Sequence, residues 1–184
     1  MGNRLTKIYT RTGDNGITGL ADGSRIDKDG MRIEVIGCID ELNSIVGMVM
    51  SHDIPDNCMN ILILIQHDLF DLGGELAIPE HVMITKRHTE KLELELDNLN
   101  KALPRLKEFI LPSGGTATSC CHFARSVCRR TERRCVSLNK EQEVNRYILT
   151  YLNRLSDLLF VIARVLSRSE GESEVLWNRN KLRP

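Results

Sequence analysis

The chain is poor in aromatic residues, carries no net charge and contains no long apolar run, and each absence excludes a class of protein. Lys plus Arg and Asp plus Glu both number 25, so the basic excess typical of general nucleic-acid binders is missing. Aromatic residues are only 4% of the 184 residues, which argues against base-stacking surfaces. No apolar run approaches the roughly 18 residues that a membrane-spanning helix needs. We therefore expect a protein that binds neither nucleic acid nor membrane.

Several motifs of metal and nucleotide sites are also missing. The six cysteines include no Cys-x-x-Cys pair, and no Glu-x-x-His pair of the kind that binds metal in ferritin-like bundles occurs. The five histidines are scattered without ligand spacing, so we expect no metal site made only of protein side chains. A P-loop sequence is absent as well. A nucleotide site in this chain must therefore be built in another way.

The cysteines and the N-terminus favour a cytoplasmic location. Cys121, Cys128 and Cys135 recur every seven residues and so share one helix face. We interpret them as small apolar core residues, which fits a reducing compartment. Residues 1–7 lack the apolar region of a signal peptide.

Hydrophobic periodicity predicts five helices, at about 34–52, 58–77, 88–103, 116–139 and 142–168. Asp56 or Asn57 is a candidate N-cap of the second helix, and Asn139 with Lys140 is expected to form the turn between the last two. No segment alternates as a strand, and the connections are short. The expected fold is all-α: a five-helix antiparallel bundle.

We expect one domain over residues 1–184, because the chain has a suitable length and no internal repeat. It divides into an N-terminal loop (1–30), the bundle (31–168) and a C-terminal tail (169–184). The loop is rich in Gly, Asp, Thr and Ser, and its glycines permit tight turns and close approach of N–H groups to a ligand. Such a segment can also be a plain loop or a disordered tail, but a length of about 30 residues favours a functional loop.

Five arginines gather in one predicted helix. Arg125, Arg129 and Arg133 lie at i, i+4 and i+8 on one face, and Arg130 and Arg134 form a second row beside them. Like charges at this spacing destabilise an isolated helix by a few tenths of a kcal/mol per pair. We interpret the cluster as a polyanion site, because the planar guanidinium binds phosphate or carboxylate in bidentate fashion. The alternative is a solvated basic face whose acids come from neighbouring helices.

Five motifs stand in order along the chain: YTRTGDNGITGL at 9–20, RIEVIGCIDELNS at 32–44, FILPSGG at 109–115, ARSVCRRTERR at 124–134 and LNRLSD at 152–157. Together they resemble the PduO-type ATP:cob(I)alamin adenosyltransferases, and the resemblance extends from about residue 7 to residue 178. Each motif is weak alone, but the five in register make chance coincidence improbable.

The resemblance implies transfer of the 5′-deoxyadenosyl group of ATP to the Co(I) of cob(I)alamin. Cobalt attacks the 5′ carbon and triphosphate leaves, which gives adenosylcobalamin and inorganic triphosphate. The resemblance further implies a homotrimer of five-helix bundles that binds ATP, with Mg²⁺, between adjacent subunits. A reductase that supplies Co(I) and an adenosylcobalamin-dependent enzyme that accepts the product are the other partners that such a reaction suggests.

By the same resemblance, ATP-binding positions fall at Arg129, Arg130, Glu132, Arg133 and Asn153. The loop positions that would cradle the phosphates are Thr10, Arg11, Thr12, Gly13, Thr18 and Gly19, with Lys28 as a point charge. Because the leaving triphosphate gains negative charge in the transition state, fixed arginines and Mg²⁺ are suited to stabilise it.

Arg125, Arg129, Asp40 and Phe109 are the expected catalytic residues. Arg125 resembles a residue that pairs with Asp40 across the subunit interface. Phe109 resembles the aromatic residue beneath the corrin ring, which would keep water and the lower ligand off cobalt and ease reduction of Co(II). The alternatives are ordinary loop packing for Phe109, a purely structural Asp40–Arg125 pair and a surface amide at Asn153.

Two other functions remain compatible with these residues. A non-catalytic nucleotide-binding regulator with the same fold would bind ATP but release no triphosphate when reduced cobalamin is added. An RNA- or polyanion-binding protein would lose affinity steeply with salt and would be insensitive to Mg²⁺-ATP. The neutral net charge and the long N-terminal loop count against the second function.

Overall fold

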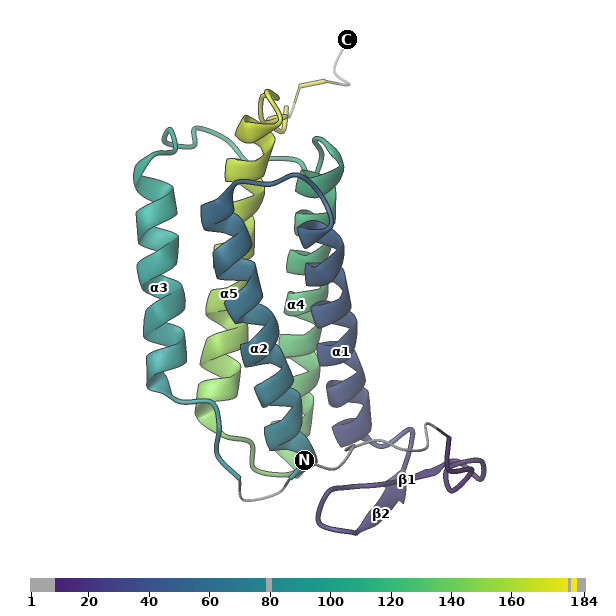
Figure 1. Ribbon diagram of the computed structural model, residues 1–184. Helices are drawn as coiled ribbons and strands as arrows, with labels where there is room; N and C mark the ends of the chain where they lie inside the picture. The colour runs from purple at the N-terminus through teal and green to yellow at the C-terminus, as the bar shows by residue number, and fades with distance from the viewer. Residues whose placement is uncertain (1–8, 79–80, 179, 182–184) are drawn as a thin grey trace.

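Helices dominate the computed structural model, which describes residues 9–78, 81–178 and 180–181. The five helices are α1 (Met31–Met50), α2 (Asp56–Ala77), α3 (Lys86–Lys101), α4 (Thr116–Glu141) and α5 (Arg146–Ser169). Consecutive helices run in opposite directions in one bundle (Figure 1), so the predicted all-α five-helix fold is confirmed. Residues 1–8, including those searched for a signal peptide, and residues 182–184 of the expected tail lie outside the described residues.

The order of packing places α4 between α1 and α5. α3 packs against α5, and α2 packs against α1. α5 supplies a large part of the core, since Tyr151, Leu155 and Ile162 are all fully buried on it. No helix among the described residues is long and apolar enough to cross a membrane.

The seven-residue repeat of cysteines lies on the buried side of α4. Cys121, Cys128 and Cys135 are fully buried, free thiols, as predicted. The thiol of Cys121 donates to the carbonyl of Leu159, and that of Cys128 donates to the carbonyl of Leu152, each at 3.2 Å. Burial raises the pKa of Cys135 to about 12, and burial raises the pKa of Cys121 and Cys128 as well. All three are therefore neutral core groups, and Cys121 and Cys128 join α4 to α5.

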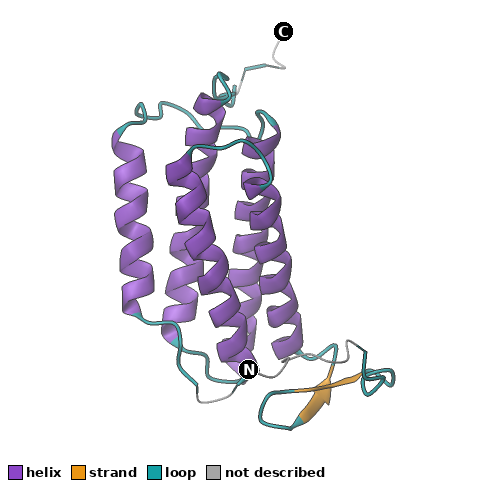
Figure 2. Ribbon diagram, in the orientation of Figure 1, coloured by secondary structure: helices purple, strands orange, loops and turns teal. Residues whose placement is uncertain are grey.

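The expectation that no segment forms a strand was wrong. β1 (Ile17–Gly19) and β2 (Arg25–Asp27) pair in antiparallel register, and Figure 2 shows this hairpin outside the helical bundle. The turn between them depends on Asp22, whose Oδ1 accepts from the backbone N (2.8 Å) and Oγ (2.6 Å) of Ser24. Three-residue strands are too short to show an alternating pattern, which explains why the sequence did not indicate them.

The predicted N-cap of α2 was also wrong. Asp56 is the first residue of the helix, and Pro55 occupies the cap position. Asn57 accepts only from the adjacent backbone N of Cys58, at 2.9 Å, and so does not cap the first turn.

The connection between α4 and α5 is displaced along the chain from its predicted position. α4 continues through Asn139 and Lys140 to Glu141, so the predicted turn at these two residues is helical. Asn139 Oδ1 instead accepts from the backbone N of Val144, at 2.9 Å, which fixes the connection beyond the helix. α5 then begins after Asn145, whose side chain caps it.

A buried carboxylate ties three parts of the fold together at the end of the bundle where α2 finishes. Glu75 is 8% exposed, and its Oε2 accepts from the backbone N of Met83 and of Ile84, each at 2.7 Å. Its Oε1 accepts from Nδ2 of Asn145, the cap of α5, at 2.8 Å. Glu75 thus links α2, the segment before α3 and the start of α5.

We expect Glu75→Gln to lower the free energy of unfolding by about 1–3 kcal/mol, because the amide cannot accept all three hydrogen bonds and leaves a buried N–H unsatisfied. Urea denaturation followed by circular dichroism measures the change. The matched control is Glu90→Gln, which removes an exposed ion pair with Lys86 and should leave the urea midpoint unchanged. Equal midpoints for the two variants would contradict the structural role of Glu75.

Candidate active site

The two arginine rows of α4 have different surroundings. Arg130 forms an ion pair with Glu41 of α1, and Arg134 Nε lies 3.4 Å from Glu34 Oε1 of the same helix. The second row thus has acids of a neighbouring helix within ion-pair distance, as the alternative interpretation expected. Arg130 was predicted to bind ATP, and in this chain its guanidinium faces an acid of α1.

The first row, Arg125, Arg129 and Arg133, has no ion pair with an acid among the described residues. Arg133 donates to the backbone carbonyl of Arg129, at 3.0 Å. The Nε atom of Arg125 is buried and has no hydrogen-bond partner in the described part of the chain. Burial lowers the pKa of the Arg125 guanidinium, and the like charge of Arg129 lowers this pKa further. This row is thus an uncompensated positive surface.

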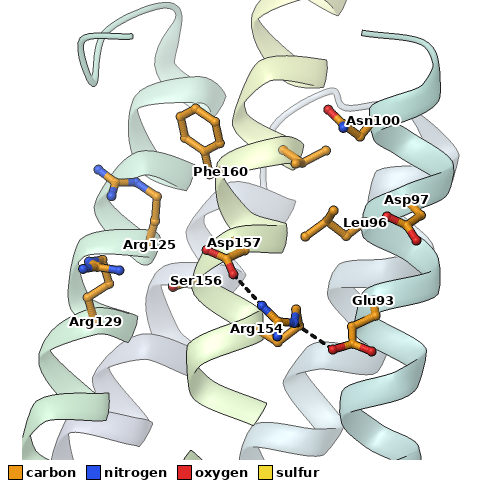
Figure 3. A pocket seen from close by; sticks show the side chains of 11 residues that line it. Glu93, Leu96, Asp97, Asn100, Arg125, Arg129, Arg154, Ser156, Asp157 and Phe160 are labelled. Carbon is orange, nitrogen blue, oxygen red and sulfur yellow. Dashed lines mark hydrogen bonds and ion pairs between the residues drawn. The ribbon is translucent and has the colours of Figure 1, made fainter. Parts of the chain in front are cut away.

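Arg125 and Arg129 face a groove of about 640 Å³ between α4, α5 and α3, which is drawn in Figure 3. On its other wall Arg154 bridges Glu93 of α3, at 2.9 Å, and Asp157 of α5, at 2.8 Å. Arg154 therefore neutralises part of the acidic wall, whereas the α4 wall keeps its positive charge. The arrangement suits a ligand with an anionic group on the α4 side.

A smaller cavity of about 300 Å³ continues along α4 beside Arg129, Glu132, Arg133 and Val136. Glu132 accepts a hydrogen bond from Nδ2 of Asn153 on α5, at 2.9 Å. The structure therefore brings together four of the predicted ATP-binding residues. Arg129 lines both the groove and this cavity, so the two adjoin at that residue.

A second cavity of about 680 Å³ adjoins the groove at the end of the bundle where α4 begins. It is called the apolar cavity here because most of its lining is apolar, although Lys107 and Glu108 also line it. Phe109 and Trp177 line it, with their rings edge to face and their centroids 6.4 Å apart. Arg125 and Phe160 line this cavity and the groove alike. Phe109 is 75% exposed in the single chain. A charged site and an apolar site thus meet at Arg125.

The predicted phosphate loop contains the β-hairpin. Thr10 Oγ1 and Thr12 Oγ1 lie 2.9 Å apart, and Arg25 donates to the carbonyl of Thr12. A Cβ on Gly13 would come within 3.0 Å of Lys28 Nζ, so glycine allows the lysine to cross the loop there. Lys28 and Gly13, both predicted to bind phosphate, are therefore neighbours.

Within one chain, the hairpin loop and Asp40 do not meet the other predicted site residues. The hairpin lies beside the start of α1, at the opposite end of the bundle from the connection that carries Phe109 (Figure 1). Asp40 is exposed on α1, lines neither the groove nor the apolar cavity, and forms no ion pair with Arg125 within the described chain. A single chain does not assemble the loop, Asp40 and the first arginine row into one site.

Several lining residues were not predicted as site residues, among them Arg154, Asp157, Phe160 and Trp177. Asp157 and Phe160 follow Asn153 at helical spacing, so extending that face of α5 would have found them. Trp177 belongs to the short apolar run Val-Leu-Trp in an otherwise polar tail, which was the only signal for it.

Comparisons with known proteins agree with this geometry. A family model described as cobalamin adenosyltransferase matches residues 8–166. A cobalamin adenosyltransferase from Cupriavidus metallidurans is 52% identical over 182 residues, covering 98% of this chain and 99% of that protein. A corrinoid adenosyltransferase from Bacillus subtilis is 43% identical over 183 residues, covering 96% and 94%.

A solved structure gives the same result for the fold. A variant of the PduO-type ATP:corrinoid adenosyltransferase from Lactobacillus reuteri, complexed with cobalamin and ATP, matches with a TM-score of 0.88 and 36% identity. The match covers 94% of this chain and 97% of that one. Matches in sequence and structure over nearly the whole length show that the chain belongs to the cobalamin adenosyltransferase family.

Proposed function

We propose that Arg129 and Arg133 of the first arginine row bind the triphosphate of ATP while the apolar cavity holds the corrin ring of the second substrate. The enzyme transfers the 5′-deoxyadenosyl group of ATP to the Co(I) of cob(I)alamin and releases triphosphate. The observation that carries the assignment is the meeting of the two cavities at Arg125. A polyanion in the groove and an apolar ring in the adjoining cavity would be in contact there.

The chemistry requires positive charge in a fixed place. Cobalt donates an electron pair to the 5′ carbon of ATP, the C5′–O bond breaks, and its electron pair leaves with the triphosphate. Charge therefore grows on the phosphate oxygens in the transition state. Arg129 and Arg133, held on one helix face without acids of their own, are suited to stabilise that charge. Asn153 and Glu132 would position the nucleotide beside them.

In this proposal ATP binds together with Mg²⁺. Among the described residues no group of three His, Cys, Asp or Glu side chains could hold a metal ion. This agrees with the usual mode of Mg²⁺ binding, in which phosphate oxygens and waters supply most ligands and the protein supplies one or two carboxylates. Glu132, the acid in the smaller cavity, would be the residue to hold it there. When bound, Mg²⁺ would neutralise charge on the leaving triphosphate.

ATP in this proposal lies between subunits of a homotrimer. Arg125 has a buried Nε with no partner among the described residues, whereas Asp40 lies exposed on another helix. A pair between Arg125 of one subunit and Asp40 of the next would satisfy both. The hairpin loop of one subunit, with Thr10, Arg11, Thr12, Gly13, Thr18, Gly19 and Lys28, would cover the arginine row of its neighbour.

The remaining proposals concern the whole chain and its surroundings. We propose that residues 1–184 act as one domain, with the loop on the ATP side and the tail on the corrinoid side. The free, buried cysteines are consistent with a cytoplasmic location. A reductase and an acceptor enzyme that uses adenosylcobalamin are the proposed partners.

The experiment that tests the function is an anaerobic assay with ATP and chemically reduced cobalamin. Adenosylcobalamin is followed by its absorbance, and triphosphate is measured separately. The two products should form in equal amounts. ATP binding without triphosphate release would instead indicate a non-catalytic regulator, and neither product would then appear.

We expect Arg129→Ala to lower the turnover rate by roughly two orders of magnitude, because losing one charged contact in a transition state costs about 3 kcal/mol. The turnover rate should also fall in Arg130→Ala if the Arg130 guanidinium leaves Glu41 and binds phosphate in the complex with ATP. The control is Arg134→Ala, which removes an exposed pair with Glu34 and should retain activity. Normal folding and near-native turnover in Arg129→Ala would contradict its assignment to the triphosphate.

We expect the protein to be a trimer at micromolar concentration, with a mass by light scattering three times that of the chain. Asp40→Ala should weaken both assembly and turnover, since Arg125, whose Nε is buried without a partner among the described residues, would lose its proposed partner. Light scattering and activity are measured on the same sample. A monomer with full activity would rule out the interfacial site.

We expect Phe109→Ala to leave ATP affinity nearly unchanged, because the side chain lies in the apolar cavity away from Arg129 and Arg133. Adenosylation that begins from cob(II)alamin should slow greatly, because water or the lower base can return to cobalt and hinder its reduction. The rate from chemically prepared cob(I)alamin should fall less. Equal losses in the two rates would mean that Phe109 only shapes the cavity.

A further inference from the structure

The C-terminal segment after α5 folds back onto the connection that carries Phe109. Leu111 N donates to the carbonyl of Val175 at 2.8 Å, and Trp177 N donates to the carbonyl of Phe109 at 2.7 Å. Ile110 and Leu176 form an isolated antiparallel bridge between these two bonds. The main chain of Phe109 is therefore held by the tail, and its ring lies against the ring of Trp177.

A buried ion pair holds the base of this arrangement. Arg164 of α5 donates from Nε to Oε1 of Glu174 at 2.6 Å, and the two side chains are only 4% and 10% exposed. Arg164 also donates from Nη2 to the carbonyl of Pro104, at 2.8 Å. One guanidinium thus binds both segments that meet at Phe109: the connection, at Pro104, and the tail, at Glu174.

The cost of this pair indicates that it does more than add stability. Removing two charges from water is expensive, and a buried ion pair often contributes less than well-packed apolar side chains of the same volume. Its planar guanidinium does fix the direction of two hydrogen bonds at once. An exposed aromatic ring such as Phe109 has few packing contacts of its own to fix its direction.

We propose that Arg164 and Glu174 are positioning residues for the corrinoid site: their ion pair sets Phe109 and Trp177 in the direction needed to face the corrin ring. This inference rests on the proposed contact between Phe109 and the corrinoid. Neither Arg164 nor Glu174 lines the apolar cavity, so both act through the segments that they anchor. Substitution of Arg164 or Glu174 should therefore leave ATP binding in the groove unchanged.

The variant that tests the proposal is Glu174→Gln, which preserves shape and removes the charge. Trp177 is the single tryptophan of the chain, so its fluorescence reports the position of the tail. We expect greater quenching of Trp177 by acrylamide, with an unchanged circular dichroism spectrum. The rate from cob(II)alamin should fall on the order of tenfold, because small misplacements of a positioning group are costly. The rate from cob(I)alamin should fall much less, and KM for ATP should not change.

Two further variants complete the test. Arg168→Gln is the control, since Arg168 is an exposed second partner of Glu174 at 3.4 Å and its loss leaves the buried pair intact. It should behave as the wild type. Arg164→Lys keeps the charge but replaces the planar fork with one ammonium, so an intermediate loss is expected. If Glu174→Gln fails to fold, the same measurements on Arg164→Lys decide the question.

Wild-type quenching and wild-type rates in Glu174→Gln and Arg164→Lys would overturn the proposal. So would equal losses in both cobalamin rates together with a raised KM for ATP, because these indicate general structural support. Phe109→Ala, measured in parallel, separates this failure from failure of the proposed function. If Phe109→Ala loses the cob(II)alamin rate selectively and Glu174→Gln does not, only the positioning role is wrong.

Discussion

The unpaired charge of Arg125 is the constraint on which the arrangement of the site depends. Its Nε is buried without a partner among the described residues, and burial together with Arg129 lowers its pKa. Folding therefore leaves an unfavourable local charge in place at the junction of the groove and the apolar cavity. Binding of an anion or of a partner's carboxylate would remove that penalty, so affinity at this point comes from electrostatics that the fold has already set up.

The packing of α4 between α1 and α5 explains why only one arginine row is available. α1 supplies Glu34 and Glu41, which neutralise the row that faces it. On the other side, α5 presents Arg154, which occupies the nearby acids Glu93 and Asp157. Neither of these two acids forms an ion pair with Arg125 or Arg129 in the described chain. The positive face depends on these neighbours as much as on the arginines themselves.

The sequence predicted the parts of the structure that are local and failed where distant segments meet. Helical periodicity located all five helices, and the seven-residue spacing identified buried cysteines such as Cys128. The difference between Arg129 and Arg130 could not be predicted, because it depends on which helix packs beside each one. The pairing of Leu111 with Val175 joins residues far apart in sequence, and the hairpin strands are too short to show a pattern.

The straightness of α4 gives the site a fixed scale. With a rise of about 1.5 Å per residue, Arg125 and Arg133 are separated by about 12 Å along the axis. The helix begins beside the Phe109 connection and ends toward the other end of the bundle, where the hairpin lies (Figure 1). α4 therefore fixes the distance between the apolar cavity at one end of the arginine row and the smaller cavity further along it. One residue inserted between Arg125 and Arg133 would rotate the later part of the helix by about 100° and separate the two side chains onto different faces.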